Sequence, residues 1–330
     1  MPHPILYATI ALALAYAFMN GYNDSGATIA PMVASRAIDR RPALILAAIA
    51  EFCGPFLFGV AVAASIGTSV VQAGVVSSLE LLVAVMTAVG WGLLANWLRV
   101  PTSASHALLG GLVGAVGAVH GVEALNFWGI ARIVLFLFLT PLVGLVLGHL
   151  TLTLVLRAVR GASPSVNQRF RYGEIVWSLL LALSHGTNDG QKSIGVITLA
   201  LVAAGVLPAF EVPGWVVLIC ALALALGVAF GSQRIMWRVG AHLYRIRPIH
   251  GFCSTSASFF TLLVATLAGA PVSGTQIVSA TLAGAGAAQR LSMVRWTVFQ
   301  SMAMAWIVTG PTTTVMAALL VLALRNLGWG

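Results

Sequence analysis

Two short polar motifs recur in an otherwise apolar chain, and each places an aspartate beside an asparagine. Asn23-Asp24 and Asn188-Asp189 lie 165 positions apart, and glycines flank both pairs. A charge at the centre of a bilayer costs about 2.5–3.5 kcal/mol on the insertion scale, so a cation, a proton or a partner group is expected beside it. Carboxylate, amide and freed carbonyl oxygens are hard ligands that suit Na⁺. The pattern predicts that these four residues bind coupling cations in helices opened by the glycines, with the two aspartates as metal ligands.

A second pair of motifs predicts an anion site. Segments 100–106 and 270–276 read Val-Pro-Thr-Ser-Ala-Ser-His and Ala-Pro-Val-Ser-Gly-Thr-Gln, 170 positions apart, and a Gly/Ala-rich segment follows each one. Hydroxyl residues after proline are typical of helix starts, whose free amides and positive dipole ends attract anions. The alternative is that the small hydroxyl residues only pack helix against helix. The predicted substrate-binding residues are Thr102, Ser103, Ser105, Ser273, Gly274, Thr275 and Lys192.

Lys192 has a second interpretation, and three further residues have candidate roles in coupling. Lys192 lies one helical turn after Asp189, where an ion pair with that aspartate competes with direct contact to the anion. Glu51 stands alone in an apolar segment and is a candidate proton or cation relay. His106 and Gln276 occupy matching positions in the two Pro-containing motifs, so we include both in the predicted cation-coupling set.

Composition places these motifs in a membrane. The chain has 330 residues, of which 59% are hydrophobic and 8% charged, and its mean hydropathy is +0.99. These values exclude a water-soluble domain, and the lack of strand-type alternation disfavours an outer-membrane barrel. The net charge of +9 comes from short basic clusters between apolar segments, which fit membrane orientation better than nucleic-acid binding. We therefore expect a polytopic helical protein in contact with lipid.

The matched motifs divide the chain into two halves. A third match, Thr140-Pro141 with Gly310-Pro311, repeats the spacing of 170. Equivalent loops have opposite charge character, because the loop after the first Asn-Asp motif is basic and its counterpart around 205–214 is not. The sequence predicts an all-α polytopic membrane protein made of two inverted-topology repeats of about five spans each, with broken or hairpin helices at the midplane. Its predicted parts are a first repeat, 1–156, a cytoplasmic linker, 157–171, and a second repeat, 172–330.

Loop charge also predicts the orientation of the chain. Under the positive-inside rule, the basic loops face the cytoplasm while the termini and the uncharged loops face outward. The predicted cytoplasmic segments are 36–42, residue 99, 157–171, 231–248 and 290–295, and the predicted outer segments are 67–78 and 205–214.

These motifs resemble the inorganic phosphate transporter (PiT) family of secondary carriers. The family's duplicated Gly-Ala-Asn-Asp signature matches 21–24 and 186–189, and its Pro-x-Ser-x-(Ser/Thr)-His signature matches 101–106 and 271–276. The resemblance spans both halves. It implies an inverted repeat with paired broken or hairpin helices, cation-coupled uptake of phosphate, and a bacterial or archaeal plasma membrane. The chain departs from the pattern at Tyr22, Thr187 and Gln276, and segment 251–255 has a neutral residue where many members carry Glu.

The predicted function is secondary active transport, namely symport of inorganic phosphate with Na⁺ or H⁺ by alternating access. No cofactor is expected beyond the co-transported ion, and a homo-oligomer is left open. A sulfate permease of the same family is the closest alternative. A channel and an intramembrane hydrolase using Ser103 or Ser105 with His106 as base are more remote, because paired acidic motifs suit coupled movement better than conduction or one catalytic centre.

Overall fold

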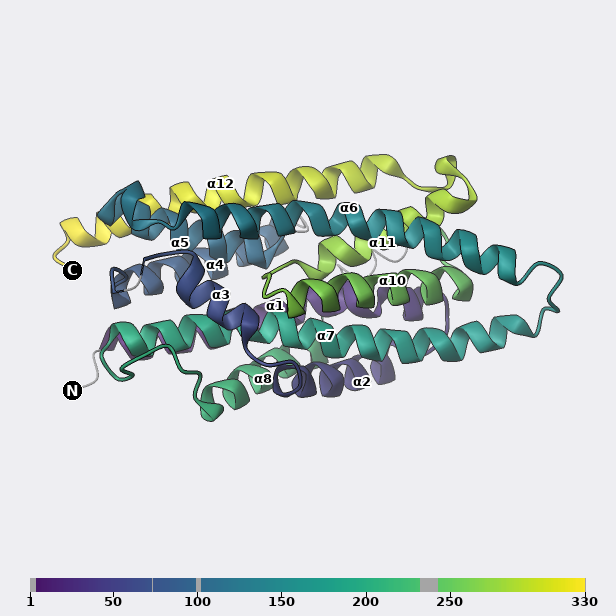
Figure 1. The fold of residues 1–330 in the computed structure, drawn as a ribbon, viewed down its shortest axis with the longest axis horizontal. Coiled ribbons are helices and arrows are strands. Elements are labelled where there is room, and N and C mark those ends of the chain that lie inside the picture. Colours follow the sequence, from purple (N-terminus) through teal and green to yellow (C-terminus); the bar gives the residue numbers. More distant parts are fainter. Residues whose placement is uncertain (1–3, 73, 99–101, 232–242, 330) are drawn as a thin grey trace.

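The chain folds into a bundle of long helices (Figure 1). The computed structural model describes residues 4–72, 74–98, 102–231 and 243–329, and these contain helices and loops but no named strand. Lipid offers no hydrogen-bond partners, so a spanning segment must satisfy its backbone internally, which a helix does. The predicted all-α membrane class is confirmed.

The helices have the following bounds. The first half contains α1 (Pro4–Ala34), α2 (Arg40–Cys53), η1 (Gly54–Phe56), α3 (Ala61–Ser69), α4 (Ser78–Leu98), α5 (Ala104–His120), η2 (Val122–Ala124) and α6 (Phe127–Ala158). The second half contains α7 (Val166–Ala203), α8 (Gly214–Ala229), α10 (Pro248–Leu267), α11 (Gly274–Gln289), η3 (Leu291–Met293) and α12 (Trp296–Asn326). Residues 159–165 alone connect α6 to α7, so most of the predicted 157–171 linker is helical.

Several helices have the length and apolarity of membrane spans. Within the described residues these are α1, α4, α6, α10 and α12, and α2 with α3, bent by 64°, adds a sixth if the bent pair is counted as one span. The 38-residue α7 is not among them, because buried polar side chains interrupt its apolar run. The shorter α5 and α11 have 17 and 16 residues. Fewer single helices therefore combine the length and the apolarity of a span than the expected repeats of about five spans imply.

Helices α1 and α7 are continuous through the Asn-Asp motifs, so the predicted opening of the backbone there is wrong. Their glycines serve close helix packing instead. A Cβ on Gly21 would collide with the backbone of Leu224 in α8, and one on Gly186 would collide with the backbone of Glu51 in α2. The broken span is α2–η1–α3, where η1 and a bend separate the two α-helices.

The described residues of the Pro-containing motifs lie at the tips of two helical hairpins, α4–α5 and α10–α11. The open ends of the first hairpin are joined by His120 Nε2 and Glu80 Oε1, 3.0 Å apart. Its inner end meets the other tip, because Ser105 Oγ donates a hydrogen bond of 2.8 Å to the carbonyl of Val272. The two hairpins reach this contact from opposite ends of the bundle (Figure 1). Residues 99–101, including Pro101 and the predicted cytoplasmic position 99, lie outside the described residues.

Packing between the halves is reciprocal. Helix α5 packs on α12 and α11 packs on α6, while α1 packs on α8 and α7 packs on α2. Glycines allow both hairpin contacts, since a Cβ on Gly114 would overlap the backbone of Thr314 and one on Gly284 would overlap that of Leu145. Each packed pair in one combination therefore has a matching pair: α11, the sequence counterpart of α5, packs on α6, the counterpart of α12.

The loops separate by charge along the bundle (Figure 1). Loops 35–39, 159–165 and 290–295 lie at one end, next to the basic clusters of the sequence. Both chain ends, loop 204–213 and loop 121–126 lie at the other, which we call the acidic end. The predicted basic segment 231–248 lies largely outside the described residues, since 232–242 are not among them.

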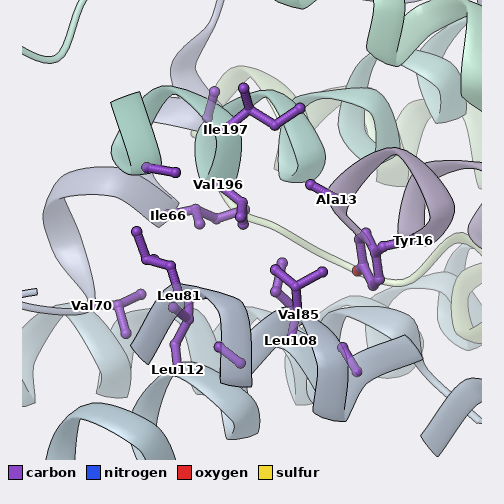
Figure 2. Close-up of a cluster of buried hydrophobic side chains, with 14 of the residues drawn as sticks. Ala13, Tyr16, Ile66, Val70, Leu81, Val85, Leu108, Leu112, Val196 and Ile197 are labelled. Atoms are coloured by element: carbon purple, nitrogen blue, oxygen red, sulfur yellow. The ribbon is translucent and has the colours of Figure 1, made fainter. Parts of the chain in front are cut away.

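An apolar cluster fills the space between the first hairpin, α3 and α7. Figure 2 shows Ile66 of α3 beside Val196 of α7, and Val70, the residue that follows α3, beside Leu112 of α5. Tyr16 of α1 borders this cluster, and its hydroxyl donates to the carbonyl of Ala104 at 3.0 Å. The cluster includes Leu108, near the inner tip of the first hairpin, and Ala124 of η2, so apolar side chains extend from that tip toward the acidic end.

Candidate transport site

Three buried carboxylates surround one imidazole at the centre of the bundle. His185 Nε2 lies 3.2 Å from Asp189 Oδ2 and 3.7 Å from Asp24 Oδ2, and His185 Nδ1 lies 3.1 Å from Glu51 Oε1. Asp189 and Glu51 have no exposed area, and Asp24 is 7% exposed. The structure thus brings together the three predicted acids from α1, α2 and α7. Carboxylate and imidazole atoms of Asp24, His185 and Asp189 lie within 4.8 Å of one another, close enough to share one cation.

Sequence reasoning missed His185 and Asn20. Asn20 Nδ2 donates a 2.7 Å hydrogen bond to Asp189 Oδ2. Both missed residues lie four positions before an aspartate of the motif, so they share its helix face. This spacing of four residues is the feature of the sequence that could have identified Asn20 and His185 as site residues. Asn20 contacts the aspartate of the other half, and His185 approaches both aspartates.

Lys192 pairs with an acid and with a hairpin tip. Its Nζ donates to Asp189 Oδ1 and, at 2.7 Å, to the carbonyl of Val272. The side chain is 1% exposed. The geometry therefore shows the intrahelical ion pair that was one of the two interpretations of Lys192. Its ammonium also connects the carboxylate cluster to the α10–α11 tip.

The α10–α11 tip is bonded to both aspartate helices. Thr275 Oγ1 donates to Asp24 Oδ1 at 2.5 Å. The amide of Asn188 donates to the carbonyl of Ala270 at 2.9 Å, and its Oδ1 accepts from the backbone N–H of Val272 at 3.2 Å. Asn188 therefore positions the tip, while Asn23 Oδ1 is buried without a hydrogen-bond partner among the described residues. Gly274 sits against the His185 ring, where a Cβ would lie within 2.5 Å of Nε2.

The other predicted tip residues lie close by. Ser103 caps α5 and accepts from the N–H of His106 at 3.4 Å, and the caps of α5 and α11 have the same extended backbone. Ser273 Oγ and Gln276 Oε1 are buried, and neither atom has a partner in the part of the chain that the structure describes. Thr102 is half-buried beside Ser103. The hydroxyl of Thr275 already donates to Asp24, so it belongs with the carboxylates.

The remote hydrolase interpretation has no geometric support. The ring nitrogens of His106 have no hydrogen-bond partner in the described ranges, and the ring packs edge-on against Phe138 at 5.7 Å. The Ser105 hydroxyl donates to Val272 and the Ser103 hydroxyl accepts a backbone N–H. Neither serine is thus paired with a general base, which nucleophilic catalysis requires.

Gln191 is another residue that sequence reasoning missed. Its Oε1 accepts from the N–H groups of Val62 and Ala63 at 2.8 and 3.2 Å, and its Nε2 donates to the carbonyl of Gly59 at 2.7 Å. A glutamine of α7 therefore replaces the missing cap of α3 at the bend of the broken span. Thr187 Oγ1 donates to the carbonyl of Gly54 at 2.8 Å on the other side of that bend. Both contacts attach α7 to the second span.

A buried polar centre between two helical hairpins, inside a polytopic helical bundle, defines a membrane transporter. The comparisons with known proteins agree. The model of the phosphate transporter family matches residues 20–317. The chain belongs to the phosphate transporter family, and it is a multi-pass plasma-membrane protein and not an enzyme.

Two relatives and one solved structure illustrate this membership. The chain is 36% identical to the probable low-affinity inorganic phosphate transporter of Rhizobium meliloti, covering 96% of this chain and 95% of that protein. It is 34% identical to the Bacillus subtilis protein of the same description, covering 94% of each. A solved structure described as "The sodium-dependent phosphate transporter" has a TM-score of 0.88 at 23% identity, covering 98% of this chain and 100% of that chain. That last similarity establishes the shared fold.

Proposed function

We propose that this protein is a secondary active symporter, which moves inorganic phosphate across the plasma membrane together with Na⁺ or H⁺. The observation that carries the proposal is the connection of two acids to a hairpin tip, directly for Asp24 and through Lys192 for Asp189. Asp24 accepts from Thr275, and Asp189 connects through Lys192 to the carbonyl of Val272. A cation that binds these acids therefore acts on the same segment that carries the predicted anion ligands.

Charge supports cation coupling. Three carboxylates face one ammonium, so with a neutral His185 two negative charges remain uncompensated in the buried centre. Such charges inside a membrane need a cation, a proton or a partner. The oxygen-rich surroundings suit Na⁺. The structurally similar transporter is described as sodium-dependent, which also favours Na⁺ over H⁺.

Hydrogen-bond chemistry favours phosphate over sulfate. The tip hydroxyl of Ser273 and the carboxylates of Asp24 and Asp189 belong to one polar centre. Phosphate carries a proton that it can donate to a carboxylate, and sulfate does not. An anion bound between the tips beside these acids would therefore be better matched as phosphate.

The arrangement of the hairpins supports alternating access. The two tips meet through Ser105 and Val272, and each hairpin approaches from a different end of the bundle (Figure 1). We propose that the halves are inverted repeats, 1–156 and 172–330, and that each hairpin opens the centre to one side. The reciprocal packing of α5 on α12 and α11 on α6 supports this relation.

Uptake into proteoliposomes tests the proposal. Purified protein would be reconstituted, and ³²P-phosphate and ³⁵S-sulfate uptake measured under an imposed inward Na⁺ gradient, an imposed pH gradient, or neither. We expect accumulation of phosphate, with the Na⁺ gradient as the driving force. If phosphate only reaches the same concentration inside and outside, and neither gradient changes that level, the protein is a passive route instead. Preferred accumulation of sulfate would reassign the substrate.

A further inference from the structure

A second cavity lies outside the carboxylate cluster. It has a volume of about 230 Å³ and lies between α3, the first turns of α6 and the tip of the α10–α11 hairpin. Its lining includes the polar side chains of Ser65 and Ser69 of α3 and of Asn126 at the start of α6, together with the tip residue Gly269. Asn126 belongs to loop 121–126, so the cavity lies toward the acidic end of the bundle (Figure 1).

Arg132 is the charged residue of this cavity. It lies in the second turn of α6, where one of its nitrogens donates to the carbonyl of Ala268 at 2.9 Å. Its guanidinium lies 6.0 Å from the centre of the Phe136 ring. No carboxylate among the described residues forms an ion pair with it. A guanidinium has five N–H donors, so most of them are free to bind an anion.

Arg132 is an exposed charged residue near the start of a membrane helix. A charged side chain on a membrane helix is rare, and it usually faces a water-filled cavity or a partner. The positive-inside rule assigns basic residues to the cytoplasmic side, whereas Arg132 lies toward the end predicted to face outward. An arginine here, beside serine hydroxyls and an amide, provides the donors that an oxyanion requires.

A much smaller void separates this cavity from the carboxylate cluster. It has a volume of about 10 Å³, and Ser105, Lys192 and Pro271 line it on the inner side. Ile133 borders both spaces, and the smaller one is also lined by Ile66, Val70 and the leucines at 108, 109 and 112 of α5. A void of this size holds about one water molecule, so an oxyanion cannot pass. The smaller void therefore lies on the way from the large cavity to Ser105 and Lys192, and apolar side chains close that way.

We propose that the 230 Å³ cavity is an outer waiting site for a small inorganic oxyanion, in which Arg132 holds the anion before the apolar barrier opens. This assignment rests on the proposed function for the direction of transport. The anion would then pass between α3 and the hairpin tip to Lys192 and Ser105. Arg132 belongs to the first half, and the residue 170 positions later is Met302. The second half therefore has no arginine at the position that matches Arg132.

Transport kinetics provide the first test. Arg132→Gln should raise the phosphate concentration for half-maximal uptake about tenfold at low ionic strength, and the difference should shrink at high salt, because the attraction is electrostatic. The maximal rate should change little, and Arg132→Lys should recover part of the affinity. Arg325→Gln is the matched control, since it removes the same charge from an exposed residue near the C-terminus, at the same end of the bundle. An unchanged half-saturating concentration in Arg132→Gln would overturn the proposal.

A second test does not depend on transport. Ser65→Cys places a thiol in the cavity with nearly unchanged shape, and its rate of modification by an anionic and a cationic methanethiosulfonate reagent can be compared. The parent protein gives the background from Cys53, which is half-buried. We expect faster reaction with the anionic reagent, loss of this preference in Arg132→Gln, and protection by millimolar phosphate. Equal rates for both reagents would overturn the waiting site. Retained preference in a protein that moves no phosphate would overturn the proposed function alone.

Discussion

Asn20 Nδ2 donates a 2.7 Å hydrogen bond to Asp189 Oδ2, and so joins the first helix of one half to the first helix of the other. Asn20 is the sequence counterpart of His185, which lies between Asp189 and Asp24. The two positions have the same place on equivalent helices and different chemistry. The two helices at the centre are equivalent in sequence position, but α1 carries an amide donor where α7 carries an imidazole. Several predictions depend on this difference.

The first prediction concerns the two aspartates. Asp24→Asn and Asp189→Asn should both abolish gradient-driven phosphate uptake, because each removes a charge that the coupling cation needs. Only Asp189→Asn leaves the buried ammonium of Lys192 without its counter-charge, which costs about 3–5 kcal/mol of folding stability. Thermal unfolding in detergent should show this loss, and Asp189→Asn with Lys192→Gln should recover stability but not transport. Equal stability of the two single variants would contradict the role assigned to the ion pair.

The second prediction concerns the hydrogen bond from Thr275 to Asp24. Thr275→Val removes the donor at nearly constant shape, and it should weaken cation binding by about 1–3 kcal/mol, a loss expected when a charged acceptor loses a donor. Thr275→Ser keeps the hydroxyl and should bind the cation almost normally. Thr313→Val in α12 is the control, because that hydroxyl bonds only within its own helix. Cation titrations monitored by tryptophan fluorescence would measure all three, and a normal affinity in Thr275→Val would remove the residue from the cation site.

The third prediction uses the close approach of Gly274 to His185. Gly274→Ala would place a methyl group within 2.5 Å of Nε2, and the ring cannot move because carboxylates lie on both sides of it. We expect loss of phosphate uptake with the protein still folded. Gly214→Ala has open space around its Cβ and should transport normally. Normal uptake by Gly274→Ala would show that His185 and the tip can move apart without loss of function.

The fourth prediction tests coupling between anion and cation. The affinity for phosphate should rise with Na⁺ concentration, and the affinity for Na⁺ should rise with phosphate by the same factor, because the two ligands share one linked equilibrium. Ser273→Ala, which removes an unpaired buried hydroxyl, should weaken phosphate binding by about 1–3 kcal/mol. Calorimetric titrations at several Na⁺ concentrations provide the test. If the affinity for phosphate changes neither with Na⁺ concentration nor in Ser273→Ala, the anion does not bind at the hairpin tips.

The fifth prediction concerns membrane orientation. Residues 121–126 lie at the acidic end with the chain termini, and 159–165 lie at the basic end (Figure 1). Val122→Cys should react with an impermeant thiol reagent added to intact cells, and Ser163→Cys should react only after the membrane is opened. Both residues are exposed, and neither has the left-handed backbone of nearby Gly121 and Gly161, where a cysteine would be strained. The opposite labelling pattern would reverse the predicted orientation.

The sequence by itself determined the class of protein and the principal acids of the site. Burying charge in lipid is expensive, so Asp24, Asp189 and Glu51 stand out in a chain that is 59% hydrophobic. The repeated spacing of the Asn-Asp and Pro-containing motifs also located both hairpin tips. His185 and Asn20 carried a weaker signal, their four-residue spacing from the aspartates, which becomes informative only when α1 and α7 face each other.

Tertiary structure alone decided how the glycines act and where the polar groups meet. A glycine beside an aspartate is compatible with an opened helix or with close packing, and the backbones of Leu224 and Glu51 settle the choice in favour of packing. The bonds from Thr275 to Asp24 and from Gln191 to α3 cross 251 and 129 positions, and no local preference encodes contacts of that range. The cavity around Arg132 has the same origin, because its walls come from α3, α6 and a hairpin tip of the other half, and only their packing brings these segments together.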